Sequence, residues 1–387
     1  MVRTTTREAD STSRASSTRD WEFDIGGTPL SESERQTFSH DLARLGRSDV
    51  VLDNFNAVLG CRTQYSQPRL LRGYTNGELA GVALFMECRK SGQCFFQPPL
   101  STLIDLPKLP VFVWSRYDFG VDNNANPGLV AEGIDRRTFR TEALAELQRN
   151  YLQGSVIELR GEDPVPGGIQ SPGFDSGYVD LDLFTDVDEF VRRRKRLRNK
   201  LKAFRNKGGT IETVRGALDQ KARETCAGFY DTMQFRLLTP YQDILADMVR
   251  NTLAVDHPDA VHFVARIDEQ IVGYHSFILG DGVLICASGG FDRSLRTTHN
   301  AYDTMIVESV RLAMNEGLGQ IQYGPVLNQT KAGLMTSFVT QDAYTYVRYG
   351  LMRRPIASLL KRSVLESDEV RRFRDLGNGT NSARVEA

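Results

Sequence analysis

Motifs of several common enzyme classes are missing from this 387-residue sequence. It contains no GxSxG, Walker or HExxH motif, which excludes recognisable serine-hydrolase, P-loop and zincin chemistry. Its five cysteines form no CxxC pair, so we expect no disulfide framework and no metal site, in a reducing compartment. No apolar run reaches the roughly 18 residues of a membrane span, and residues 1–20 lack the apolar core of a signal peptide. These absences predict a cytoplasmic protein.

An excess of either sign of charge is also lacking, because the sequence has 48 basic and 49 acidic residues. A balanced chain has no global field for DNA, so any site for a polyanion must be local. The length is sufficient for two domains, each with its own core.

The order of predicted elements occurs twice along the chain. Each half has a β-hairpin, a further strand, a polar loop, a helix and a strand, and the first hairpin turns at Asn76-Gly77. Residues 161–174 contain three prolines and four glycines and form the predicted linker. The predicted parts are a disordered tail (1–25), a first domain (26–160), the linker (161–174), a second domain (175–350), and a helical extension with a loose tail (351–387).

The second half contains the most informative stretch. Residues 260–291 are three β-rich runs with turns at Asp268–Glu269 and at 280–282, which predicts an antiparallel meander. A polar loop and an amphipathic helix follow, with Asn300 as the expected N-cap and Gly317 just past the end. A short strand at 319–324 closes the unit.

This order of elements resembles the core of the GNAT acyltransferase superfamily. Two passages, Tyr178–Gly209 and Tyr323–Met335, are similar to segments of tandem-domain GNAT proteins of the Fem-like branch. The resemblance implies an α/β (α+β) fold of two tandem GNAT-like domains, each a mixed, mostly antiparallel sheet flanked by helices. It also implies that acyl-CoA lies beside the turn before the helix at Asn300.

That turn supplies the predicted cofactor-binding residues. In typical relatives a glycine-rich loop holds the CoA pyrophosphate at a helix N-terminus. This sequence has no glycine between Phe291 and the helix, which is a departure from the family pattern. Arginine charge and hydroxyl donors would replace the loop, although two arginines that merely solvate a loop are the alternative. The predicted residues are Arg293, Arg296, Thr297, Thr298 and Asn300.

The resemblance places Lys331 near the reacting carbonyl, where a cation stabilises an oxyanion. Tyr323 and Asn328 stand in the same segment and are predicted to position a substrate or donate a proton. His275 is the predicted general base. In a strand it alternates with Tyr274, so the two side chains face opposite sides of the sheet. The simpler alternatives are a surface lysine and a buried core histidine.

A helix is predicted at about 219–236, and such a helix often flanks the acceptor in this family. Acceptor binding is therefore predicted for Asp231, Gln234 and Arg236, with Arg236 as a partner for an acceptor carboxylate; ordinary helix surface is the alternative. Residues 192–207 are rich in Lys and Arg and contain no acid. This basic helix is either a solvated face or a partner for the phosphates of CoA, a tRNA or a lipid carrier.

The leading hypothesis is an N-acyltransferase that moves an acyl group from acyl-CoA, or another carrier thioester, to the amine of a small or medium-sized acceptor. No permanently bound cofactor is expected; acyl-CoA is the co-substrate. The alternatives are a Fem-type aminoacyl-tRNA-dependent transferase, with tRNA as partner, and a non-catalytic GNAT-fold binding protein. The acyl group, the acceptor and the oligomeric state stay open.

Overall fold

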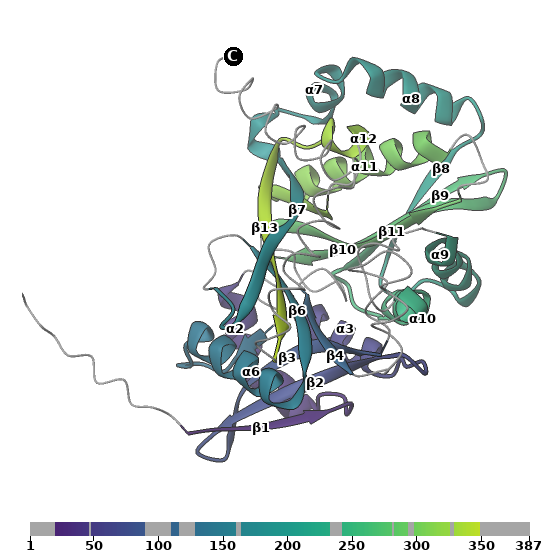
Figure 1. Cartoon of the computed structure of the whole chain (residues 1–387). Helices are drawn as coiled ribbons and strands as arrows, with labels where there is room; N and C mark the ends of the chain where they lie inside the picture. The colour runs from purple at the N-terminus through teal and green to yellow at the C-terminus, as the bar shows by residue number, and fades with distance from the viewer. Residues whose placement is uncertain are drawn as a thin grey trace, which may run out of the picture.

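The computed structural model of the chain describes residues 20–45, 48–89, 110–115, 128–159, 164–232, 242–280, 282–292, 298–325 and 329–348 (Figure 1). The strands in these residues are β1 (Trp21–Gly26), β2 (Ser66–Thr75), β3 (Glu78–Cys88), β4 (Val111–Ser115), β5 (Gly128–Val130), β6 (Gln153–Leu159), β7 (Gly168–Asp180), β8 (Thr210–Arg215), β9 (Ala260–Ile267), β10 (Gln270–Gly280), β11 (Val283–Phe291), β12 (Gln320–Pro325) and β13 (Ser337–Val347). The helices are α1 (Glu32–Thr37), α2 (Ser39–Arg44), α3 (Val50–Leu59), α6 (Arg136–Asn150), α7 (Val187–Arg192), α8 (Lys195–Arg205), α9 (Gln220–Thr232), α10 (Gln242–Thr252), α11 (Thr298–Asn315) and α12 (Gln329–Ala332), with a 3₁₀ turn at Leu181–Leu183.

The described strands form one continuous sheet that has two similar halves. Its order is β1-β2-β3-β4-β6 in the first half and β7-β12-β11-β10-β9-β8 in the second, with β13 between them and β5 paired to β3. Strand β13 pairs antiparallel with both β6 and β7, and it runs from one half to the other (Figure 1). Among the described strands, only the pairs β4–β6 and β11–β12 are parallel. The predicted α/β class, with two mixed and mostly antiparallel halves, is confirmed.

The hairpins of the two halves share an unusual detail. The turns Asn76–Gly77 and Asp268–Glu269 both have positive φ at two successive residues, as type I′ turns require. In each hairpin the strand after the turn leaves its third residue, Ala80 or Val272, without a partner on the other strand. Such a bulge fixes the register of the hairpin. The two halves therefore repeat in register as well as in element order.

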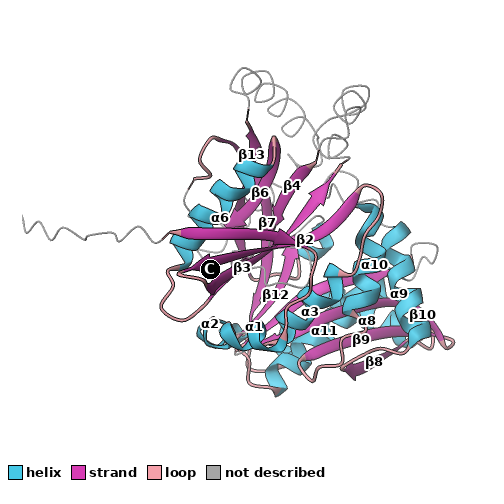
Figure 2. Ribbon diagram, turned by 90° about the horizontal axis from the view of Figure 1, so that it is seen from below, coloured by secondary structure: helices cyan, strands magenta, loops and turns pink. Residues whose placement is uncertain are grey.

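Helices cover both faces of each half. In the second half, α7, α8 and α11 bury apolar side chains on one face, and α9 and α10 cover the other. In the first half, α6 packs on one face and α2 and α3 on the other (Figure 2). Ile244 and Met248 of α10 join the core of the first half, so this helix ties the halves together. No described helix is long and apolar enough to cross a membrane.

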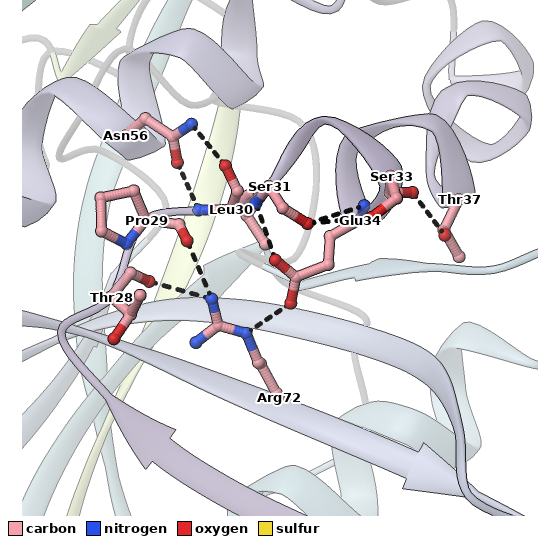
Figure 3. Close-up of polar contacts among 9 residues, drawn as sticks. All are labelled: Thr28, Pro29, Leu30, Ser31, Ser33, Glu34, Thr37, Asn56 and Arg72. Carbon is pink, nitrogen blue, oxygen red and sulfur yellow. Dashed lines mark hydrogen bonds and ion pairs between the residues drawn. The ribbon is translucent and has the colours of Figure 1, made fainter.

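A buried arginine fixes the start of the first half (Figure 3). Arg72 of β2 donates to Glu34 at 2.8 Å and to the carbonyl oxygen of Thr28 at 2.9 Å. Glu34 also completes a capping box with Ser31 at the start of α1. Burial acts to raise the pKa of Glu34, but the hydrogen bonds from Arg72 and Ser31 hold that pKa below its usual value.

Several predicted boundaries are wrong. Residues 21–26 belong to strand β1 and not to the tail, because Trp21 and Phe23 pack on Phe139 of α6. Strand β7 begins at Gly168, inside the predicted linker, since β13 supplies a partner strand there. Helix α11 begins at Thr298, so Asn300 lies within it and is not its N-cap. The predicted extension at 351–387 lies outside the described residues.

Candidate functional site

Two parallel strands part in the middle of the second half. Strands β11 and β12 pair only between Val283–Ile285 and Gln320–Gln322, although β11 continues to Phe291 and β12 to Pro325. Beyond the last pair the backbone groups of one strand no longer face those of the other. We call this place the strand divergence.

Lys331 reaches the strand divergence from the short helix α12. Its Nζ donates a hydrogen bond of 2.6 Å to the backbone carbonyl oxygen of Tyr323, the first residue of β12 beyond the pairing. The side chain is half-buried, and burial lowers the pKa of Lys331 from 10.5 to about 8. A cation that titrates this close to neutral pH, beside an opening in a sheet, is typical of a functional site.

His275 lies on the same face of the sheet as helix α11. Its ring meets Tyr302 edge-on at a centroid distance of 5.0 Å, while Tyr274 joins the core under α9 and α10. The predicted alternation of the two side chains is therefore confirmed. Burial, and to a smaller extent the charge of Lys331, lower the pKa of His275 to about 3. His275 stays neutral at pH 7, so the structure does not favour the predicted role as a general base of near-neutral pKa.

The hydroxyl of Tyr323 is turned away from the strand divergence. It hydrogen-bonds to Ser309 and to the carbonyl oxygen of Ile306, both on α11, and burial raises its pKa. This hydroxyl is committed to the core, so the predicted role of Tyr323 as a proton donor is not favoured by its geometry. Its backbone carbonyl, which accepts from Lys331, is the part of Tyr323 at the site.

Cys286 of β11 lies close to Lys331 and Tyr302, and interacts electrostatically with both. Burial raises the pKa of its thiol to about 11, so the thiol is protonated at pH 7 and is a poor nucleophile. Its Sγ donates weakly to the carbonyl oxygen of Ser288 at 3.7 Å. No sequence pattern links residues 275, 286, 302 and 331, because four separate elements carry them.

Most of the other predicted site residues lie outside the described part of the chain. Thr298, Asn300 and Asp231 belong to helices α11 and α9, and the side chains of Thr298 and Asp231 are not described. The predictions for all of these residues stay predictions. Those wholly outside are Arg293, Arg296, Thr297, Asn328, Gln234 and Arg236.

The basic run at 192–207 is two helices, and two of its cations point inward. Lys200 pairs with Asp303 of α11 at 2.6 Å, and the Asp303 side chain is only 1% exposed. Arg194 donates to the carbonyl oxygen of Leu334 at 3.0 Å. Sequence reasoning missed both anchors, although Lys200 and the buried Leu201 are neighbours on one side of α8. The remaining cations of α8 are exposed, at Lys195, Arg196, Arg198, Lys202 and Arg205.

One group among the described side chains has the composition of a metal site. Asp49, His257 and Asp259 lie together between α3 and β9. His257 Nε2 lies 3.0 Å from Asp49, and its Nδ1 accepts from the backbone N–H of Asp259 at 3.1 Å. Both ring nitrogens are thus engaged within the protein, and the group links the two halves.

Comparisons with known proteins identify the second half. Residues 191–331 match the family model described as an acetyltransferase (GNAT) domain. The comparison with curated proteins gives no match. L-PGS from Bacillus licheniformis is similar in fold, with a TM-score of 0.52 and 14% identity over 87% of this chain and 98% of that chain. A tandem GNAT protein from the clavulanic acid biosynthesis pathway has a TM-score of 0.44 and 13% identity over 85% of this chain and 99% of that chain. FemX has a TM-score of 0.40 and 11% identity over 76% of this chain and 91% of that chain. The match supports the predicted resemblance to GNAT proteins for residues 191–331.

Proposed function

We propose that this chain, whose second half is a GNAT acyltransferase domain, moves an acyl group from CoA or another carrier thioester to the amine of a small or medium-sized acceptor. The observation that carries the proposal is the position of Lys331, whose amine stands at the strand divergence. A parallel strand pair that parts leaves backbone groups without a partner on the other strand, and a cation there favours developing negative charge.

The chemistry follows from this arrangement. The acceptor amine attacks the thioester carbonyl, the C–N bond forms, and the carbonyl oxygen becomes an oxyanion that the Lys331 ammonium stabilises. Collapse of the tetrahedral intermediate breaks the C–S bond, and the proton lost by the amine ends on the leaving thiolate. The ring of His275 meets the rings of Phe277 and Tyr302 edge-on near Lys331.

Turnover with defined donors tests the proposal. The full-length protein is incubated with a panel of acyl-CoA thioesters and small amines, and amide product and free thiol are measured by mass spectrometry and thiol titration. Loss of the oxyanion-stabilising cation in Lys331→Met should lower the rate about 100-fold or more, whereas Lys331→Arg should retain part of it. Absence of amide with every thioester would count against this donor class.

The exposed face of α8 supports a second candidate function, in which the donor is an aminoacyl-tRNA ester. The five exposed cations of α8 form no ion pair with the described side chains and lie opposite the buried Leu197 and Phe204. Figure 1 shows α7 and α8 on the outside of the second half, directly above α11 and α12. RNA binding through such a face weakens steeply with salt. Loss of activity after RNase treatment separates this candidate from a CoA-dependent enzyme.

A further inference from the structure

The basic run of the second half is interrupted at Arg194. Helix α7 ends at Arg192, α8 begins at Lys195, and Arg194 between them has φ −120° and ψ 77°, outside helical geometry. Lys and Arg are good helix formers, so local preference predicts one continuous helix here. The cause of the break must therefore be a tertiary contact.

The guanidinium of Arg194 makes that contact. It lies over the ring of Phe190 at 3.9 Å from the centroid and donates to the carbonyl oxygen of Phe190 at 3.1 Å. The same group donates to the carbonyl oxygen of Leu334 at 3.0 Å. One planar side chain thus joins the last turn of α7 to the chain that follows α12. A guanidinium suits this task because its donors are fixed in a plane and point in two directions.

Leu334 closes the turn that carries Lys331. Its backbone N–H donates to the carbonyl oxygen of Lys331 at 3.0 Å. Helix α12 has four residues, which is too short to be stable without tertiary support. The place of Lys331 therefore depends on what holds the end of this turn, and Arg194 is bonded to that end.

We infer that Arg194 is the positioning residue for Lys331: it leaves the helix in order to clamp the α12 turn, and so keeps the amine at the strand divergence. The inference deepens the proposed function, because Lys331 matters chemically only if that function is right. The clamp itself is a property of the folded chain and can be tested without any substrate.

The expected consequence of losing the clamp is a change in the reactivity of Lys331. An amine with a pKa of about 8 is neutral in about one molecule in ten at pH 7, whereas a hydrated lysine with a pKa near 10.5 is neutral in about one in three thousand. The pH midpoint at which Lys331 becomes reactive reports its environment. The titratable groups that face the amine of Lys331 are Cys286 and His275.

The experiment is pulsed acetylation of the full-length protein with acetic anhydride from about pH 6 to about pH 11. The yield at Lys331 is read by peptide mass spectrometry in the unsubstituted protein, in Arg194→Gln and in Arg194→Lys. Arg198→Gln, at an exposed arginine of α8, is the matched control. The midpoint for Lys331 should move upward by about one pH unit or more in Arg194→Gln, stay displaced in Arg194→Lys, and stay unchanged in Arg198→Gln.

An Arg194→Gln variant that unfolds at the same temperature as the unsubstituted protein and has the same Lys331 midpoint would overturn the inference. If Arg194→Gln does not fold, Arg194→Lys decides the matter, together with amide hydrogen exchange of the peptide that contains residues 329–335. Faster exchange there supports the clamp, and unchanged exchange with an unchanged midpoint overturns it. Failure of the proposed function appears separately, as a displaced midpoint in a protein that never transfers an acyl group.

Discussion

Replacement of Lys331 by methionine should make the protein more stable at neutral pH while it removes the cation from the site. Methionine has a similar length and shape but no charge. Burial lowers the pKa of Lys331 from 10.5 to about 8. The charged amine therefore has a higher free energy in the folded state than in the unfolded chain, and the substitution removes this cost.

The magnitude follows from the two pKa values. A difference of about 2.5 corresponds to about 3 kcal/mol, which is an upper limit because the side chain is only half-buried. The lost hydrogen bond to the Tyr323 carbonyl offsets about 1–2 kcal/mol of this. We expect Lys331→Met to raise the free energy of unfolding by about 1–2 kcal/mol at pH 7.

The difference in free energy of unfolding between Lys331→Met and the unsubstituted protein should decrease as the pH rises. Below about pH 8 both states of the unsubstituted protein carry the protonated lysine, so the full disadvantage is present. Between about pH 8 and 10.5 the unfolded chain binds more protons than the folded one, so the stability of the unsubstituted protein rises relative to the variant. Above this window the variant should be less stable by about 1 kcal/mol, since only the lost hydrogen bond remains.

Urea unfolding of both proteins across this pH range measures the effect. Lys202→Met, at an exposed lysine of α8, is the control and should give a curve parallel to that of the unsubstituted protein. If the curve for Lys331→Met is also parallel, the amine is hydrated in the folded state and the reasoning about the strand divergence is refuted.

Three further predictions concern buried charge and helix capping. Lys200→Met removes the ion pair of 2.6 Å that the buried Asp303 carboxylate makes, and should lower the free energy of unfolding by about 3 kcal/mol. With Asp303→Asn added, the loss in urea titrations should be smaller than the sum of the single losses. Burial lowers the pKa of His262 to about 4 and that of His275 to about 3, so the unfolded chain binds more protons as pH falls from about 6.5 to about 4. Stability should therefore drop across that window, and less so in His262→Gln. Asp135→Ala removes the hydrogen bond of 2.8 Å to the Thr138 backbone N–H and should cost about 1 kcal/mol, which Asp135→Ser should restore by the same assay.

Local chemistry made part of the fold predictable. The turns at Asn76–Gly77 and Asp268–Glu269 depend on a few adjacent residues, so the hairpins followed from the sequence. Strand β1 also had a signal, since Trp21, Phe23 and Ile25 alternate with polar residues, but the composition of the preceding tail obscured it. Strand β13 was beyond local reasoning, because its partners β6 and β7 belong to different halves.

The site was predictable only in part, for a similar reason. Resemblance to a family indicated Lys331, but the hydrogen bond to the Tyr323 carbonyl depends on where β11 and β12 stop pairing. The charge pattern predicted one basic helix, whereas tertiary contacts of Arg194 broke it in two. A pattern along the chain shows which residues share a face, but it does not show which residues from distant elements meet.

Tight packing in the first half gives a last prediction about which half can act. When the two hairpins are aligned at their shared bulge, Ala83 occupies the position that His275 has in the second half. Gly81, close to Ala83, has no room for a side chain, since an added Cβ would lie 2.6 Å from the Phe139 ring. Gly81→Ala should therefore lower the free energy of unfolding by about 1–3 kcal/mol in urea. Gly60→Ala, where nothing lies within 4 Å, should change it little. Because Lys331 lies in the other half, its acetylation midpoint should be the same in both variants. A displaced midpoint in Gly81→Ala would show that the two halves share one site, and would contradict a transfer site confined to the second.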